Sequence, residues 1–159
     1  MNTVYLLLGS NLGKPLKFLK TAEKEITSQV GQVIKKSHIY KTAAWGNKDQ
    51  PDFYNQILIV ETHLEAKPVL NTILEIETKL GRKRILKYEP RIIDIDILFF
   101  NNNTINTPEL KVPHPLIQER RFVLVPLNEL SPNLNHPIIN KTIGELLDIC
   151  TDKSDVERN

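Results

Sequence analysis

Strand-like and helix-like apolar patterns follow one another along this chain in an order that few folds accommodate. Short apolar or alternating runs predict strands, and apolar residues spaced three and four apart predict two helices between them. The resulting order, β-α-β-β-α-β, predicts an α+β fold, namely a ferredoxin-like sandwich with an antiparallel sheet and helices packed on it. The six segments are Val4–Leu8, Pro15–Val30, 33–39, Tyr54–Thr62, Pro68–Leu80 and Ile92–Phe100.

The remaining third of the chain carries weaker signals. Asn101–Asn103 is typical of a turn after the last predicted strand. Arg120–Leu130 fits a helix or a strand, and we favour the helix. Thr142 and Glu145 have the spacing of a capping box and predict a short final helix. With 159 residues and no linker-like composition, we expect one domain over residues 1–159.

The composition excludes several classes of protein. A net charge of +2, from 21 basic and 19 acidic residues, argues against a general polyanion binder, so we expect no nucleic-acid partner. The apolar runs are too short to span a bilayer, and no secretory signal is evident, so we expect no membrane partner. The single cysteine, Cys150, excludes an internal disulfide. We expect a monomer in the reducing cytoplasm.

Two acidic residues stand out in the strongest strand pattern. The strand period places Asp94 and Asp96 on one face, with Cα atoms about 7 Å apart, and turns Ile93, Ile95, Ile97 and Phe99 toward a core. Carboxylates at this separation can hold a pair of hard cations such as Mg²⁺. The alternative is that both acids lie on the solvent face of an edge strand, although acidic residues are depleted in strands.

A basic segment directly precedes this strand. It contains Arg82, Lys83, Arg84, Lys87 and Arg91, and guanidinium groups bind phosphate in a bidentate manner. Beside a carboxylate pair, such a segment indicates a site for a nucleotide with magnesium; alone it would be read as a solvated loop. Glu77 borders the apolar face of the second predicted helix, where it needs a partner that is either functional or a nearby basic residue.

Other candidate residues are weaker when taken singly. Gly9–Lys14 superficially resembles a phosphate loop, but Pro15 replaces the required Ser or Thr, so a tight strand-to-helix turn explains the glycines better. Phe53 and Phe122 could stack on a flat heterocycle while Asn55 reads its edge, although core packing is the commoner role of isolated aromatics. His114, held between two prolines, suits a phosphate contact. The four histidines show no zinc spacing.

Five motifs in order resemble one known family. The chain is similar to the 6-hydroxymethyl-7,8-dihydropterin pyrophosphokinases of folate biosynthesis, from about Val4 to Pro137, and the element around Asp94 and Asp96 is the most specific. The motifs are Leu8-Gly-Ser-Asn-Leu-Gly13, Gln50-Pro-Asp-Phe-Tyr-Asn55, Gly81-Arg-Lys-Arg84, Pro90-Arg-Ile-Ile-Asp-Ile-Asp96 and Val112-Pro-His-Pro115.

This resemblance implies an ATP-dependent diphosphokinase that transfers diphosphate from ATP to the pterin hydroxymethyl group and leaves AMP. It implies two Mg²⁺ ions on Asp94 and Asp96, with Arg82 and Arg91 as the catalytic arginines. The residues that it assigns to ATP and phosphate are Arg82, Arg84, Arg91, His114, Arg120 and Glu77. Those that it assigns to the pterin are Thr42, Ala43, Trp45, Phe53, Asn55 and Phe122.

Two rival functions remain to be weighed. Sandwiches of this shape with aromatic residues on the sheet also bind single-stranded RNA, but the aromatic signature of those modules is absent here. A catalytically inactive relative would have little reason to keep both aspartates together with the arginines. The sequence therefore favours the enzyme.

Overall fold

The molecule is built on an antiparallel sheet of six strands. The structure is a computed structural model that describes residues 1–44, 49–81 and 92–159. Strands lie in the order β5-β1-β4-β3-β8, and β2 pairs with the same side of β4 as β3 does. The strands are β1 (Asn2–Ser10), β2 (Gln32–Lys36), β3 (Tyr40–Thr42), β4 (Phe53–Thr62), β5 (Asp94–Phe100), the separate pair β6 (Ile105–Asn106) and β7 (Lys111–Val112), and β8 (Val156–Arg158).

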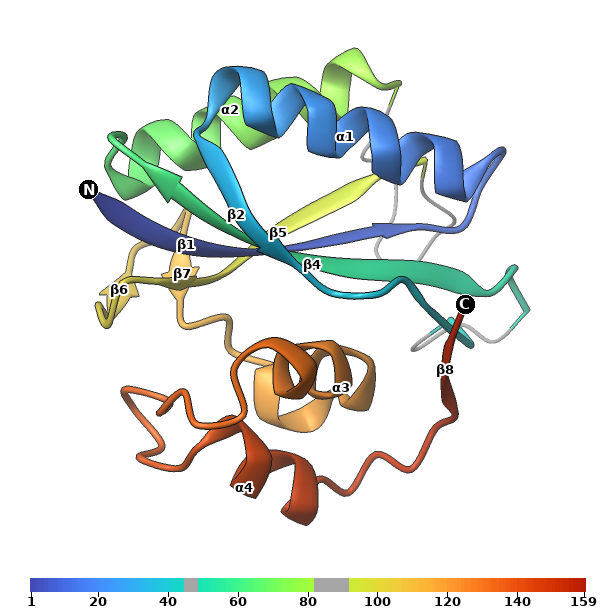
Figure 1. Cartoon of the computed structure of the whole chain (residues 1–159), viewed down its shortest axis with the longest axis vertical. Coiled ribbons are helices and arrows are strands. Elements are labelled where there is room, and N and C mark those ends of the chain that lie inside the picture. The colour runs from blue at the N-terminus through green and yellow to red at the C-terminus, as the bar shows by residue number, and fades with distance from the viewer. Residues whose placement is uncertain (45–48, 82–91) are drawn as a thin grey trace.

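Helices cover both faces of the sheet. Figure 1 shows α1 and α2 on one face and α3 and α4 on the other. The helices are α1 (Pro15–Gln29), α2 (Ala66–Lys79), α3 (Arg121–Leu130) and α4 (Ile143–Ile149), with a 3₁₀ turn at Ile117–Glu119. The predicted α+β sandwich with a β-α-β-β-α-β core and an antiparallel sheet is confirmed, and the helices on the second face add a third layer.

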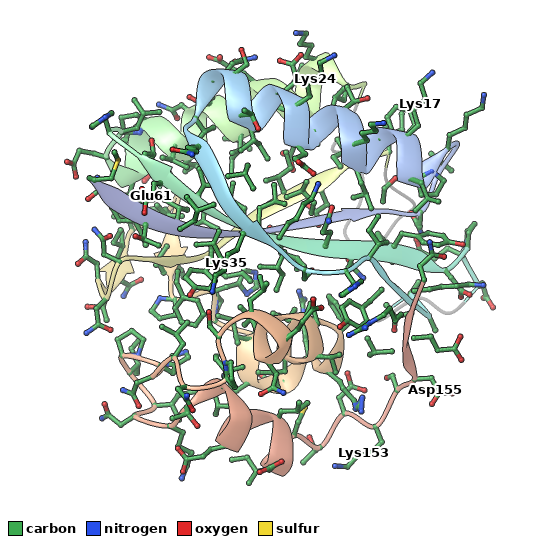
Figure 2. All side chains as sticks on the ribbon, viewed as in Figure 1. Lys17, Lys24, Lys35, Glu61, Lys153 and Asp155 are labelled. Atoms are coloured by element: carbon green, nitrogen blue, oxygen red, sulfur yellow. The ribbon has the colours of Figure 1, made fainter. Side chains whose placement is uncertain are left out.

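Helix α1 follows directly from its apolar spacing. Proline occupies the start of the helix, where its missing N–H leaves no bond unmade. Leu19, Ala22 and Ile26 are fully buried against the sheet, whereas Lys17 and Lys24 point outward into solvent (Figure 2). Burial of this stripe, at about 25 cal/mol per Å² of apolar area, holds the helix on the sheet.

Strand β5 departs from the predicted alternation at one point. The register against β1 shifts between Tyr5 and Leu6, which face Phe99 and Ile97, so Leu98 is an extra residue in β5. Ile93, Ile95 and Ile97 pack on the face of α1 and α2 as expected. The prediction for Phe99 is wrong in its face, because beyond the bulge this ring packs with α3 and α4.

The C-terminal third confirms the two predicted helices and adds three short strands, β6, β7 and β8. The Thr142 hydroxyl accepts from Glu145 N at 3.2 Å, and the Glu145 carboxylate accepts from Thr142 N at 2.9 Å, which completes the predicted capping box. Strand β8 was not predicted, and it pairs with β3 through Tyr40–Arg158 and Thr42–Val156. In the described residues, no helix combines the length and apolar character needed to cross a membrane.

Candidate active site

A cavity opens between one end of the sheet, where β1 and β3 finish and β4 and β5 begin, and the start of α3. The space inside it, part of which is open to solvent, measures about 510 Å³. Strands β1, β3, β4 and β5 supply one wall, and the residues around the start of α3 supply the other. The lining residues are Leu7, Gly9, Thr42, Ala43, Phe53, Asn55, Asp94, Asp96, Arg120 and Phe122. Eight of these ten were candidates from the sequence, so the fold brings most of the described candidates together.

The two aspartates lie on the cavity side of β5, as the strand period predicts. Both are partly buried, and the residue between them, Ile95, points into the opposite core. The described residues contain no group of three or more His, Cys, Asp or Glu side chains that could hold a metal ion. Two carboxylates still fit Mg²⁺, because this ion commonly takes one or two carboxylates and completes its shell with phosphate oxygens and water.

Glu77 on α2 forms a hydrogen bond with the backbone of β5. Its side chain is 1% exposed on α2, and Oε2 accepts a hydrogen bond of 2.7 Å from the backbone N–H of Ile95. A carboxylate in the apolar layer is costly unless it is hydrogen-bonded, and this bond provides such a partner. Because Ile95 separates Asp94 from Asp96, the bond fixes the backbone from which both aspartates project.

His114 lies close enough to Arg120 and Asp94 for their charges to act on it. Burial and, to a smaller extent, the nearby Arg120 charge lower its pKa to about 4, and Asp94 partly opposes both effects. The ring is therefore neutral near pH 7. Its Nδ1 accepts from Leu116 N at 3.2 Å, so the proton of the neutral ring belongs on Nε2.

Aromatic rings and one amide form the other half of the cavity. The Arg120 guanidinium lies over the Phe122 ring, with Cζ 5.6 Å from the ring centroid. Asn55 is 3% exposed, and its Nδ2 has no hydrogen-bond partner among the described residues. A buried donor without a partner costs about 1–3 kcal/mol. A buried amide without a partner, in a cavity that two aromatic rings also line, suits a flat ligand with a polar edge.

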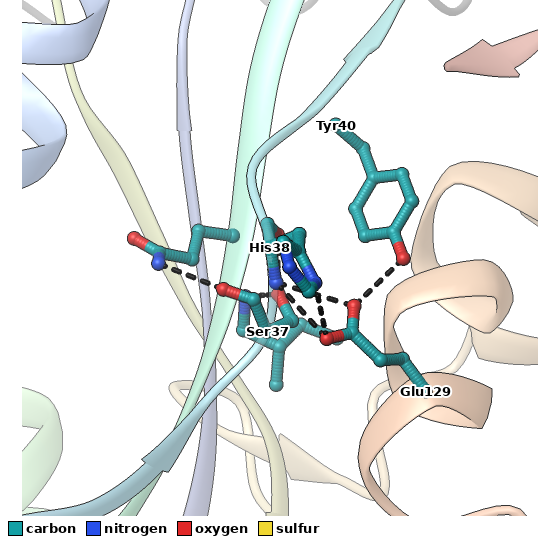
Figure 3. Close-up of polar contacts among 6 residues, drawn as sticks. Ser37, His38, Tyr40 and Glu129 are labelled. Carbon is teal, nitrogen blue, oxygen red and sulfur yellow. Dashed lines mark hydrogen bonds and ion pairs between the residues drawn. The ribbon is translucent and has the colours of Figure 1, made fainter. Parts of the chain in front are cut away.

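The two walls of the cavity are connected by Glu129, on the last turn of α3. Its carboxylate accepts from the Tyr40 hydroxyl at 2.7 Å, from His38 N at 3.2 Å and from the His38 ring at 2.7 Å (Figure 3). Burial alone would raise the pKa of Glu129, but these hydrogen bonds outweigh it and hold the pKa below its usual value. Tyr40 begins β3, which ends at Thr42 in the cavity wall, so one carboxylate joins α3 to that wall.

The glycine-containing loop after β1 does not form a phosphate loop. Gly13 has a φ of +69° and makes the turn into α1, as expected, whereas Gly9 lies inside β1. Asn11 donates to Gln50 Oε1 at 2.7 Å and to the carbonyl of Pro51 at 2.9 Å. This segment therefore ties the end of β1 to the approach of β4, which carries Phe53 and Asn55.

Four sequence candidates lie outside the described residues, namely Trp45, Arg82, Arg84 and Arg91. Sequence reasoning missed Leu7 and Gly9 as cavity residues. Leu7 carries no signal beyond its apolar run. Gly9 follows the predicted strand Val4–Leu8, and only the pairing of β1 with β4 and β5 places it beside the cavity.

Comparisons with known proteins show what this chain is similar to. The family model of 7,8-dihydro-6-hydroxymethylpterin-pyrophosphokinase matches residues 5–132. A 2-amino-4-hydroxy-6-hydroxymethyldihydropteridine pyrophosphokinase of Aquifex aeolicus is 40% identical over 145 residues, which cover 91% of this chain and 90% of that one. A folic acid synthesis protein of Pneumocystis carinii is 38% identical over 149 residues, which are 94% of this chain but 20% of the fungal one.

Solved structures support the fold. The Plasmodium falciparum HPPK-DHPS crystal structure with STZ-DHP superposes with a TM-score of 0.78 at 20% identity, over 92% of this chain. The chain spans 43% of that longer protein. At this identity the likeness establishes the architecture alone.

The fold is an α+β sandwich with a cavity lined by a carboxylate pair and aromatic rings. With a family model matched over most of its length and relatives near 40% identity, the chain belongs to the 7,8-dihydro-6-hydroxymethylpterin-pyrophosphokinase family.

Proposed function

We propose that the cavity is the site at which this chain, as one pyrophosphokinase domain over residues 1–159, transfers diphosphate from ATP to 6-hydroxymethyl-7,8-dihydropterin in folate biosynthesis. The hydroxymethyl oxygen forms a bond to the β-phosphorus, and the bond between that phosphorus and the oxygen bridging to the α-phosphorus breaks. AMP leaves with the electron pair, and the hydroxyl proton passes to water. The carrying observation is the convergence of Asp94, Asp96, Asn55 and Phe122 on one cavity.

The aspartate side of the cavity is proposed to receive the triphosphate. Asp94 and Asp96 would hold two Mg²⁺ ions, which when bound neutralise phosphate charge and lower the pKa of the attacking hydroxyl. Arg120 is positioned at this cavity to contribute a fixed positive charge. Neutral His114 would donate from Nε2 to a phosphate oxygen. Glu77 would share in ATP binding indirectly, through the strand segment that carries the aspartates.

The other side is proposed to receive the pterin. Phe53 and Phe122 would stack on its two faces, and the Asn55 amide would bond its edge. Backbone groups of Thr42 and Ala43, both in the cavity wall, would add contacts. A preformed slot of this kind lowers the entropy cost of orienting the substrate, which is a large part of catalysis when two substrates must meet.

Four residues that lie outside the described ranges belong to the proposal because of their side-chain chemistry. Arg82 and Arg91 would neutralise charge that develops on the transferred group, and Arg84 would bind phosphate. Trp45 would join the pterin contacts. We further propose that the chain acts as a monomer in the cytoplasm, which light scattering and fractionation of the native host would test.

The metal role of the aspartates has a direct test. Asp94→Asn and Asp96→Asn should each lower kcat by about a thousandfold or more, because each removes a charged ligand that no other described acid in the cavity replaces. The melting temperature should stay within a few degrees, since both side chains are only partly buried. Asp52→Asn is a matched control, because Asp52 is an exposed acid that forms an ion pair with Lys41. This variant should leave kcat unchanged. Near-normal turnover in both aspartate variants with magnesium would refute the assignment.

A further inference from the structure

Gly9 occupies the middle of a row of residues that crosses three strands. In the sheet register it lies opposite Asn55 on β4 and opposite Asp94 on β5. Residues directly opposite in antiparallel strands project from the same face, and all three line the cavity. The row therefore has an amide at one end, a carboxylate at the other and no side chain between them.

The missing side chain at Gly9 is required for space and not for backbone conformation. Its φ lies outside the left-handed region, so an alanine could adopt this strand geometry. A Cβ placed on Gly9 would lie 2.7 Å from Asn55 Oδ1 and 3.7 Å from Phe53 Cδ1. The first distance is shorter than real Cβ atoms show, so Asn55 would have to move.

The space over Gly9 sets how the Asn55 amide is turned. Oδ1 occupies that space, 2.7 Å from where a Cβ on Gly9 would lie. Nδ2 is buried and has no hydrogen-bond partner among the described residues. The rotation of the amide therefore decides whether its oxygen, an acceptor, or its nitrogen, a donor, meets the edge of a ligand.

We propose that Gly9 is a specificity-determining position, which sets the orientation of the Asn55 amide by lacking a Cβ and thereby selects which edge of a heterocycle this amide can hydrogen-bond. This role rests on the proposed function, because it concerns how the pterin half of the same cavity recognises its substrate. Gly9 itself acts through Asn55 and is a positioning residue. Because Gly9 has no side chain, the cavity also stays open between Asn55 and Asp94.

Gly9→Ala tests the proposal, with Gly144→Ala as the matched control. Gly144 lies in α4, where a Cβ would meet its nearest atom at 3.4 Å, an ordinary contact. Gly9→Ala should raise the pterin KM at least tenfold while kcat at saturating pterin changes less than threefold. The dissociation constant for a non-hydrolysable ATP analogue with magnesium should change less than twofold. Gly144→Ala should leave all three quantities unchanged.

A double variant shows whether the effect passes through Asn55. In an Asn55→Ala background, adding Gly9→Ala should raise the pterin KM less than twofold further, since the amide that it displaces is gone. A full tenfold effect in that background would overturn the proposal. So would an unchanged pterin KM in Gly9→Ala alone. If the wild-type protein fails to bind the pterin at all, the proposed function fails instead.

A second measurement needs no variant and covers the case in which Gly9→Ala fails to fold. In the wild-type protein, the side-chain amide signals of Asn55 can be followed by ¹⁵N–¹H NMR as 6-hydroxymethylpterin is added. The side-chain amide signals of Asn55 should shift on saturation, as expected when the edge of a ligand meets this amide. Absence of any shift while the pterin is bound would overturn the proposal.

Discussion

Replacing Glu129 by alanine tests whether one carboxylate fastens α3 to the cavity wall of the sheet. Glu129 accepts three hydrogen bonds from β3 and the segment before it: two from His38, and one from the hydroxyl of Tyr40. In Glu129→Ala the Tyr40 hydroxyl loses its charged acceptor. Because Tyr40 is only 5% exposed, water replaces this acceptor poorly, and the loss costs about 2 kcal/mol. The His38 N–H contributes about 1 kcal/mol, and the His38 ring, 55% exposed, contributes little.

The sum is a loss of about 3 kcal/mol in the free energy of unfolding, or roughly 6–12 °C in melting temperature for a chain of this size. Urea unfolding at pH 7 measures it, with Glu23→Ala as the control, since Glu23 forms an exposed ion pair with Lys36 worth about 0–1 kcal/mol. A cycle with Tyr40→Phe should give a coupling of at least about 1 kcal/mol. A loss in Glu129→Ala no larger than in Glu23→Ala would refute the reasoning.

The pH dependence has a definite sign. Because the pKa of Glu129 is lower in the folded state than its ordinary value of 4.5, its stabilisation is fully present above pH 4.5. It is lost as the pH falls through the folded pKa. The stability difference between the wild type and Glu129→Ala should therefore shrink below pH 4.5.

Two further predictions concern the ligands. Phe122→Ala should weaken pterin binding by about 1–3 kcal/mol through loss of one stacking ring, with a much smaller change for ATP; equal losses in calorimetric titration of both ligands would mark Phe122 as a core residue. The Arg120 charge helps to lower the pKa of His114 to about 4. The negative charge of ATP should offset it and raise this pKa. Nucleotide binding near pH 5.5 should therefore be accompanied by uptake of a proton at the His114 ring. Titration calorimetry in two buffers of different ionisation enthalpy should show this uptake falling in His114→Asn, and equal uptake in both proteins would contradict the assignment.

Local patterns were sufficient for the elements that pack by their own periodicity. Helix α1 was predictable because Leu19, Ala22 and Ile26 share a stripe behind a starting proline, and α4 because its capping box is a contact within four residues. Strand β8 was not predictable. It is only three residues long, and it forms because its backbone pairs with β3, more than 110 residues earlier.

Long-range contacts explain what was missed at the site as well. The face of Phe99 changed because of a bulge that only pairing with β1 reveals. Glu129 looked like an ordinary helix residue, since its partners His38 and Tyr40 lie about 90 residues away. The aspartate pair was found because two acids in an apolar strand are an anomaly that the sequence itself displays.

The products of a single reaction test the central proposal most directly. The purified chain is incubated with magnesium, ATP and 6-hydroxymethyl-7,8-dihydropterin, and the phosphorus signals are followed by ³¹P NMR. We expect AMP and a pterin diphosphate to appear in equal amounts, with neither formed in Asp96→Asn. ADP together with a pterin monophosphate, or ATP consumption that does not depend on the pterin, would contradict diphosphate transfer at this site.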